Sequence, residues 1–156
     1  MLDIGADAPE FELPDQHGEP RSLSEFEGQR VVVYFYPRAD TPGCTTEACS
    51  FRDAYEEFEE RDVAVVGISD DPVEDLADFA EKHDLPITLL SDESGEVADA
   101  YDSYGEKNMF GNTFDGVFRN TYVVDESGQI AAVYEGVVPE GHAEELLAEL
   151  SDDGAQ

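Results

Sequence analysis

The chain has 156 residues, enough for one domain with one hydrophobic core, and 40% of them are hydrophobic. Acidic residues outnumber basic ones by 39 to 8, which gives a formal net charge of −31 at pH 7. Such a charge argues against nucleic acid and anionic membranes as partners, and it strains a compact fold unless salt screens it. Because the screening length falls to about 3 Å at molar salt, the composition predicts a protein of a salt-rich, halophile-like cytoplasm.

No apolar stretch reaches the roughly 18 residues of a membrane span, and the N-terminal residues lack the basic and apolar regions of a signal peptide. We therefore expect a soluble, cytoplasmic protein. Residues 1–150 are predicted to form a single domain, and residues 151–156 a flexible acidic tail. In a reducing compartment, a lone pair of cysteines is more often catalytic or redox-sensing than structural.

The first half of the chain alternates strand and helix patterns. Residues 11–13 and 21–23, around a turn at 16–18, predict a small β-hairpin. Three apolar, β-branched runs predict strands that are buried on both faces: residues 30–36, 63–68 and 87–90. Helical spacing of apolar residues follows each run, at residues 45–61, 72–83 and 96–101. Asp71 is expected to cap the second helix, with Pro72 at its first position.

The second half contains a glycine-punctuated loop at residues 105–116, two strands and a last helix. Met109, Phe110 and Phe114 in that loop either line a substrate entrance or pack over the core. The strands at 117–124 and 130–134 are joined by a turn at 125–128, and the helix covers 141–150. This order predicts an α/β, thioredoxin-like three-layer sandwich, a mixed β-sheet flanked by helices with an N-terminal β-hairpin. Its active site is expected where the first central strand leads into its helix.

That position holds Cys44, and the only other cysteine is Cys49. Cys44 falls in the first turn of the helix, where the helix dipole and unpaired N–H groups favour a thiolate. The alternative is a pair of small buried hydrophobes, as many cysteines are. Residues five apart on a helix have Cα atoms about 8.7 Å apart, whereas a disulfide needs them within about 7 Å. A bond between these sulfurs therefore requires the helix to unwind.

The segment at residues 36–49, Tyr-Pro-Arg-Ala-Asp-Thr-Pro-Gly-Cys-Thr-Thr-Glu-Ala-Cys, resembles the active-site signature of the peroxiredoxins. The second cysteine, five residues after the first, is similar to the peroxiredoxin Q group, also called bacterioferritin comigratory proteins. Further blocks that resemble this group lie at residues 67–69, 89–92, 104–107 and 116–125. The resemblance therefore covers nearly the whole chain.

The resemblance implies a role for each of several residues. Cys44 is expected to attack a peroxide as a thiolate and to become a sulfenic acid. Thr41 is expected to hold the peroxide in line through its hydroxyl, and Arg119, placed in an apolar strand, to favour the thiolate and the leaving oxygen. Pro37 is expected to shield the pocket from water. Glu47 either orients an arginine or is a solvated carboxylate.

The resemblance also implies that Cys49 resolves the sulfenic acid as an intramolecular disulfide, which a thioredoxin-like dithiol protein reduces. The expected enzyme is thus a thioredoxin-dependent peroxidase of hydrogen peroxide and organic hydroperoxides, monomeric and without cofactor or metal. Two alternatives are a thioredoxin-type thiol–disulfide oxidoreductase, which usually carries Cys-x-x-Cys, and a redox sensor that signals through its disulfide. The three histidines show no metal-ligand spacing and are expected at the surface: His17, His83 and His142.

Overall fold

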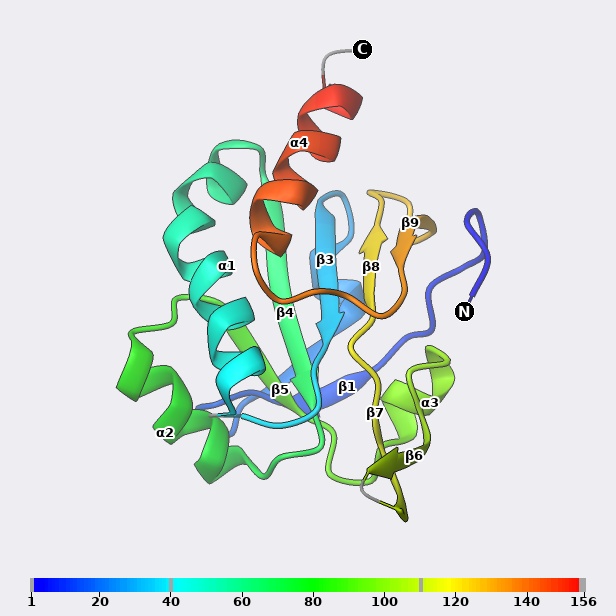
Figure 1. Cartoon of the computed structure of the whole chain (residues 1–156). Coiled ribbons are helices and arrows are strands. Elements are labelled where there is room, and N and C mark those ends of the chain that lie inside the picture. Colours follow the sequence, from blue (N-terminus) through cyan, green and yellow to red (C-terminus); the bar gives the residue numbers. More distant parts are fainter. Residues whose placement is uncertain (1, 40, 110, 155–156) are drawn as a thin grey trace.

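The computed structural model describes residues 2–39, 41–109 and 111–154 (Figure 1). Its centre is a five-stranded sheet in the order β5–β4–β3–β8–β9. Three neighbouring strands run parallel: β3 (Arg30–Phe35), β4 (Val63–Ser69) and β5 (Thr88–Ser91). Two more strands complete the sheet: β8 (Thr121–Val124) pairs antiparallel with β3, and β9 (Ile130–Tyr134) pairs antiparallel with β8. The sheet is therefore mixed, as predicted, and β3 is its middle strand.

Both faces of the sheet are covered. Side chains of a strand alternate between the two faces, so neighbouring residues of β3 enter different cores. Val32 and Tyr34 of β3 face the core under three helices: α1 (Pro42–Glu60), α2 (Val73–His83) and α4 (His142–Gly154). Val31 and Val33 face the second core, closed by α3 (Glu96–Ala100), the hairpin of β1 (Glu12–Pro14) and β2 (Pro20–Ser22), and the 3₁₀ turn η1 (Leu23–Phe26). Figure 1 shows α1 and α4 side by side over the sheet. The predicted three-layer sandwich and N-terminal hairpin are confirmed.

The predicted loop at residues 105–116 is wrong, since this segment is a second hairpin. Strands β6 (Tyr104–Met109) and β7 (Asn112–Val117) pair antiparallel, with Gly111 in the turn at a φ of 81° that favours glycine. Phe110 lies outside the described residues, as do the side chains of Met109 and Phe114. The predicted strand at 117–124 is also divided, because β7 ends at Val117 and β8 begins at Thr121.

Two helix termini differ from the prediction. Asp71 is buried and does not cap α2; its carboxylate accepts hydrogen bonds from the backbone N–H of Ala39 (2.7 Å) and from the Ser69 hydroxyl (2.8 Å), and Pro72 occupies the capping position. Asp71 therefore connects the β4–α2 turn to the chain that precedes α1. At the other end, α4 continues to Gly154, so residues 151–154 are helical.

Candidate active site

Cys44 is the third residue of α1, directly after the turn that leaves the central strand β3. Its side chain is 1% exposed. Pro42 fits the first helical position because its missing N–H would have no partner there. The first backbone bond of the helix runs from the Thr45 N–H to the Thr41 carbonyl (2.8 Å). The thiol thus lies at the helix N-terminus, at the carboxyl end of the middle strand, as the sequence predicted.

Arg119 contacts Cys44 across 75 residues of sequence. Its Nη2 donates a hydrogen bond to Cys44 Sγ at 3.3 Å, and its Nη1 donates to Glu47 Oε1 at 2.8 Å. Glu47 is fully buried, so it is a partner of the arginine and not a solvated carboxylate. Gly43 makes room for the guanidinium, because a Cβ at this position would lie 3.1 Å from Nη2.

Arg119 lies in the connection between β7 and β8, not in a strand as the sequence predicted. The backbone of this connection is held on both sides: the Val137 N–H donates to the Arg119 carbonyl (2.8 Å), and the Phe35 N–H donates to the Asn120 carbonyl (2.8 Å). Asn120 is buried, and its side chain donates to Ser103 Oγ (3.0 Å). Sequence reasoning missed Asn120; an asparagine just after the candidate arginine was the available signal.

Burial sets the protonation of the groups around this arginine. Burial raises the pKa of Glu47 to about 7, although the charge of Arg119 and its hydrogen bond oppose the rise. Burial also acts to lower the pKa of Arg119, but the charges of Cys44 and Glu47 outweigh it, so the net shift is upward. Arg119 is therefore a fixed cation between two acids that lie one turn apart on α1.

The other predicted site residues lie on the segment between β3 and α1. Thr41 occupies the N-cap position of α1 in an extended conformation, and its hydroxyl donates to the Arg38 carbonyl (2.9 Å). Pro37 is half-buried and follows the buried Tyr36. The structure thus joins Cys44, Glu47 and Arg119 by direct contacts and places Thr41 and Pro37 on the adjoining turn.

Cys49 is half-buried on the same helix, and both cysteines are free thiols. Helix α1 is continuous between them. Beyond Cys49 the helix is anchored: Phe51 is fully buried, and Arg52 Nη1 donates to the His83 carbonyl at the end of α2 (2.8 Å). From Phe51 onward, α1 is thus held by packing and by a contact with α2.

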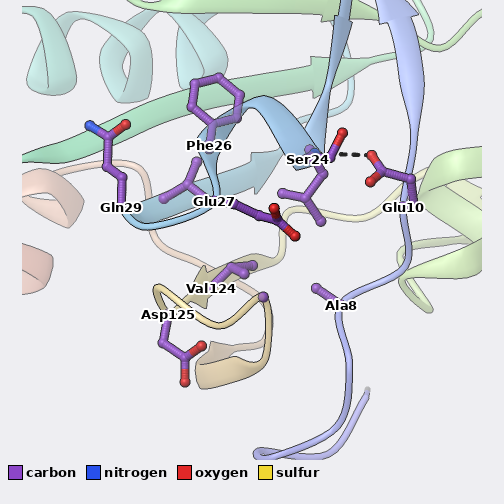
Figure 2. A pocket seen from close by; sticks show the side chains of 11 residues that line it. Ala8, Glu10, Ser24, Phe26, Glu27, Gln29, Val124 and Asp125 are labelled. Atoms are coloured by element: carbon purple, nitrogen blue, oxygen red, sulfur yellow. Dashed lines mark hydrogen bonds between the residues drawn. The ribbon is translucent and has the colours of Figure 1, made fainter.

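A cavity elsewhere in the molecule is not part of this site. Figure 2 shows it between the N-terminal segment, the η1 turn and the β8–β9 turn, with Ala8, Glu10, Phe26, Val124 and Asp125 on its walls. Its floor includes Val31, at the start of β3, whereas Cys44 follows the end of that strand. Six residues of strand span roughly 16–20 Å, so the cavity and the thiol lie at opposite ends of the sheet.

One histidine differs from the sequence prediction. His142 is buried, not at the surface, and its Nε2 shares a hydrogen bond with Thr121 Oγ1 (3.0 Å). Burial, and the nearby charge of Arg119, lower the pKa of His142 to about 4. Within the described residues, no group of three or more histidine, cysteine, aspartate or glutamate side chains could hold a metal ion. No helix in those same residues is both long and apolar enough to cross a membrane.

Comparison with known proteins places the chain in a family. The AhpC/TSA family model matches residues 4–133. The chain is 45% identical to peroxiredoxin Bcp of Escherichia coli over 97% of both chains, and 42% identical to peroxiredoxin Bcp of Bacillus subtilis over 97% of this chain and 96% of the other.

Solved structures agree with the sequence relatives. A cysteine-to-serine mutant of Xylella fastidiosa PrxQ superimposes with a TM-score of 0.93 at 29% identity, over 99% of this chain and 98% of that one. The bacterioferritin comigratory protein of Xanthomonas campestris, studied for its alkyl peroxide reduction activity, gives a TM-score of 0.89 at 31% identity, over 97% and 99% of the two chains. The resemblance indicated by residues 36–49 is confirmed. The chain belongs to the AhpC/TSA family and, within it, to the Bcp/PrxQ peroxiredoxins.

Proposed function

We propose that this peroxiredoxin, a thiol-dependent peroxidase, reduces hydrogen peroxide and organic hydroperoxides through Cys44. The observation that carries the proposal is the 3.3 Å contact from Arg119 Nη2 to Cys44 Sγ, made at a helix N-terminus in a buried site. Both the guanidinium and the helix end favour a negative sulfur. A thiolate there is the nucleophile that the reaction needs.

The thiolate of Cys44 attacks one oxygen of the peroxide, so that an S–O bond forms and the O–O bond breaks. Cys44 is oxidised by two electrons to a sulfenic acid, and the leaving oxygen becomes water or an alcohol after it takes a proton. Arg119 stabilises the thiolate first and then the charge that develops on the leaving oxygen. Thr41 turns its hydroxyl from the Arg38 carbonyl to the peroxide, and Pro37 keeps water from the pocket.

Cys49 resolves the sulfenic acid by attacking it and releasing water, which gives an intramolecular disulfide. Because α1 holds the two Cα atoms about 8.7 Å apart by helix geometry, this step requires the helix to unwind between them. A terminal turn can open because such turns have low local stability, and the anchors at Phe51 and Arg52 limit the extent of the opening. A thioredoxin-like dithiol protein then reduces the disulfide.

The composition of the chain supports a proposal for the cellular conditions in which this cycle operates. The net charge of −31 disfavours nucleic acid, anionic membranes and self-association at low salt, so we infer a cytoplasmic, monomeric enzyme of a salt-rich cell. Residues 1–150 act as one domain, with the last six residues outside the catalytic unit. The chemistry uses the two sulfurs and needs no cofactor or metal.

The proposal is tested by stopped-flow peroxide reduction at high salt, followed by intact-mass analysis. Cys44→Ser should abolish peroxide turnover. Cys49→Ser should complete the first turnover, gain one oxygen atom on Cys44 and fail to cycle with thioredoxin. Full thioredoxin-dependent cycling by Cys49→Ser would overturn the resolving role, and peroxide turnover by Cys44→Ser would overturn the proposed nucleophile.

A second measurement addresses the unwinding step. Hydrogen exchange at residues 44–49 should be slow in the reduced chain and fast in the disulfide form. Protection that is equal in both forms would contradict the resolving mechanism, because an intact helix cannot bring the two sulfurs together.

A further inference from the structure

Two buried acids share one cation at this site. Arg119 donates to Glu47 Oε1 at 2.8 Å and to Cys44 Sγ at 3.3 Å. The side chains of both acids are closed to solvent, at 0% and 1% exposure. If Cys44 and Glu47 are ionised together, the buried cluster carries one uncompensated negative charge, and burial makes such a charge costly.

The second oxygen of Glu47 points to the same conclusion. Oε2 is buried and has no hydrogen-bond partner within the described part of the chain. An ionised carboxylate can accept about four hydrogen bonds, and the structure supplies one, from Arg119. Burial then favours the protonated carboxyl, in agreement with a pKa raised to about 7.

Titratable groups from other parts of the chain face this cluster: Tyr34 from β3, Tyr36 directly after β3, His142 from α4 and Lys107 from β6. Burial raises the pKa of both tyrosines and lowers the pKa of the histidine, so all three are neutral near pH 7. The lysine acts on Arg119 and on Cys44 through its charge, and its ammonium lies 5.7 Å from the Phe118 ring. The group that donates hydrogen bonds to both acids is Arg119.

Because the two acids compete for that arginine, their charges are coupled. A thiolate at Cys44 favours a proton on Glu47, and a neutral Cys44 favours its release. We propose that Glu47 holds a proton while Cys44 is a thiolate and gives it up, for the leaving oxygen, when Cys44 becomes a sulfenic acid. This inference rests on the proposed function of Cys44.

The step balances in atoms and charge. The thiolate, the hydroperoxide and the protonated carboxyl give the sulfenic acid, water or an alcohol, and the carboxylate. Sulfur loses two electrons, the two oxygens of the O–O bond gain them as that bond breaks, and the proton that Glu47 releases makes up for the one that the leaving oxygen takes. Glu47 does not touch the reacting atoms, so it is a positioning residue that also supplies charge balance. After the step, Arg119 is paired with one negative group, the carboxylate of Glu47.

The test is the number of protons taken from solvent when Cys44 is oxidised. Both arms carry Cys49→Ser, so that the reaction stops at the sulfenic acid, and the comparison is between the chain that keeps Glu47 and the Glu47→Gln variant. Equimolar hydrogen peroxide is mixed with each protein in weak buffer with a pH indicator, from pH 6 to pH 9. Thiolate absorbance gives the amount of Cys44 consumed.

Glutamine keeps an oxygen for Arg119 but has no proton to give. The Glu47→Gln variant should take up one proton per thiolate consumed at every pH. The chain that keeps Glu47 should take up clearly less than one around pH 7 to 8, where its carboxyl is protonated beside a thiolate and ionised beside a sulfenic acid. Glu47→Asp, which keeps the carboxyl, should restore an uptake below one. Equal uptake of one proton with Glu47 present and in the Glu47→Gln variant would overturn the inference.

Infrared difference spectra give a second readout that does not depend on a variant folding. Oxidation of the chain that keeps Glu47 should remove a protonated-carboxyl band and create a carboxylate band, and a spectrum without that change would overturn the inference. Failure of the proposed function looks different, because then no oxygen atom is added to Cys44. A sulfenic acid that forms with one proton taken up in both proteins refutes the role of Glu47 alone.

Discussion

Replacing Arg119 by methionine separates its catalytic effect from its structural one. Methionine removes the charge but keeps an unbranched side chain in the half-buried position. The variant loses the donor to Cys44 Sγ at 3.3 Å and the donor to Glu47 Oε1 at 2.8 Å together. The first loss should slow peroxide attack, and the second should destabilise the fold.

The two losses have different expected sizes. Removing one preorganised donor from a developing charge costs roughly 10²–10³-fold in rate, about 3–4 kcal/mol. Removing one partner of a fully ionised buried pair costs up to roughly 3–5 kcal/mol of stability; Glu47 is fully buried, and uptake of a proton by its carboxyl limits the loss. Loss of the cation also raises the pKa of Glu47 further above its present value of about 7. The stability loss should therefore be larger at pH 8 than at pH 5, where the carboxyl is protonated.

The assay combines single-turnover peroxide reduction with urea unfolding at pH 5 and pH 8. Arg119→Met/Glu47→Gln is the matched control, because it removes the orphaned carboxylate. The double variant should recover most of the unfolding free energy at pH 8 and none of the lost rate. If the double variant regains the rate, or if Arg119→Met attacks peroxide at the unmodified rate, the role given to the 3.3 Å contact is wrong.

Three further predictions concern the arginine pocket, the buried histidine and the surface charge. Gly43→Ala should gain up to about 1 kcal/mol of stability from helix propensity. It should also slow the attack on peroxide about tenfold, about 1.4 kcal/mol, because its Cβ would lie 3.1 Å from Arg119 Nη2. Thermal unfolding measures the first effect and the single-turnover rate the second, and an unchanged rate contradicts the prediction. Folding lowers the pKa of His142 to about 4. The contribution of the neutral histidine to stability is therefore complete above pH 6.5, and about 3 kcal/mol of it is lost as the pH falls through 4. In urea unfolding from pH 7 to pH 4, His142→Gln should lose less stability than the unmodified chain, and an equal loss in both would refute the prediction. With a net charge of −31, the unfolding midpoint should rise between low and molar salt, and a constant midpoint would contradict the halophile hypothesis.

The sequence predicted the location of Cys44 because local signals agreed there. A continuous apolar run from 31 to 36 predicts a buried middle strand, and Pro42 and Gly43 predict a turn into a helix. The family resemblance of residues 36–49 rests on the same short segment. Strand, turn and first helical turn are all local in sequence, so patterning and residue type were sufficient.

Long-range hydrogen bonds were beyond that kind of reasoning. The contact between Cys44 and Arg119 joins residues 75 apart; the family resemblance implied it, but local patterning could not, nor could it indicate that the buried Glu47 pairs with the same arginine. Apolar neighbours suggested that Arg119 lies within a strand, but backbone bonds to Val137 and Phe35 interrupt the strand around it. Asp71 has the sequence of an N-cap, yet the tertiary contact with Ala39 takes its carboxylate. In each case a polar group bonds to a residue that is distant in the sequence, where the pattern predicted a local partner.

In the proposed cycle, the contact that favours attack on the peroxide also holds the segment that must unwind for resolution. While Cys44 is a thiolate, Arg119 holds it and Glu47 against the core, which keeps the first turns of α1 folded. Attack on a peroxide removes the negative charge from sulfur, so Arg119 loses its ion pair with Cys44, although the guanidinium itself stays charged. In the proposed cycle the carboxylate of Glu47 then keeps the arginine, so unwinding residues 44–49 must still break the 2.8 Å contact between them. Resolution by Cys49 is therefore expected only after oxidation has freed the sulfur from this arginine.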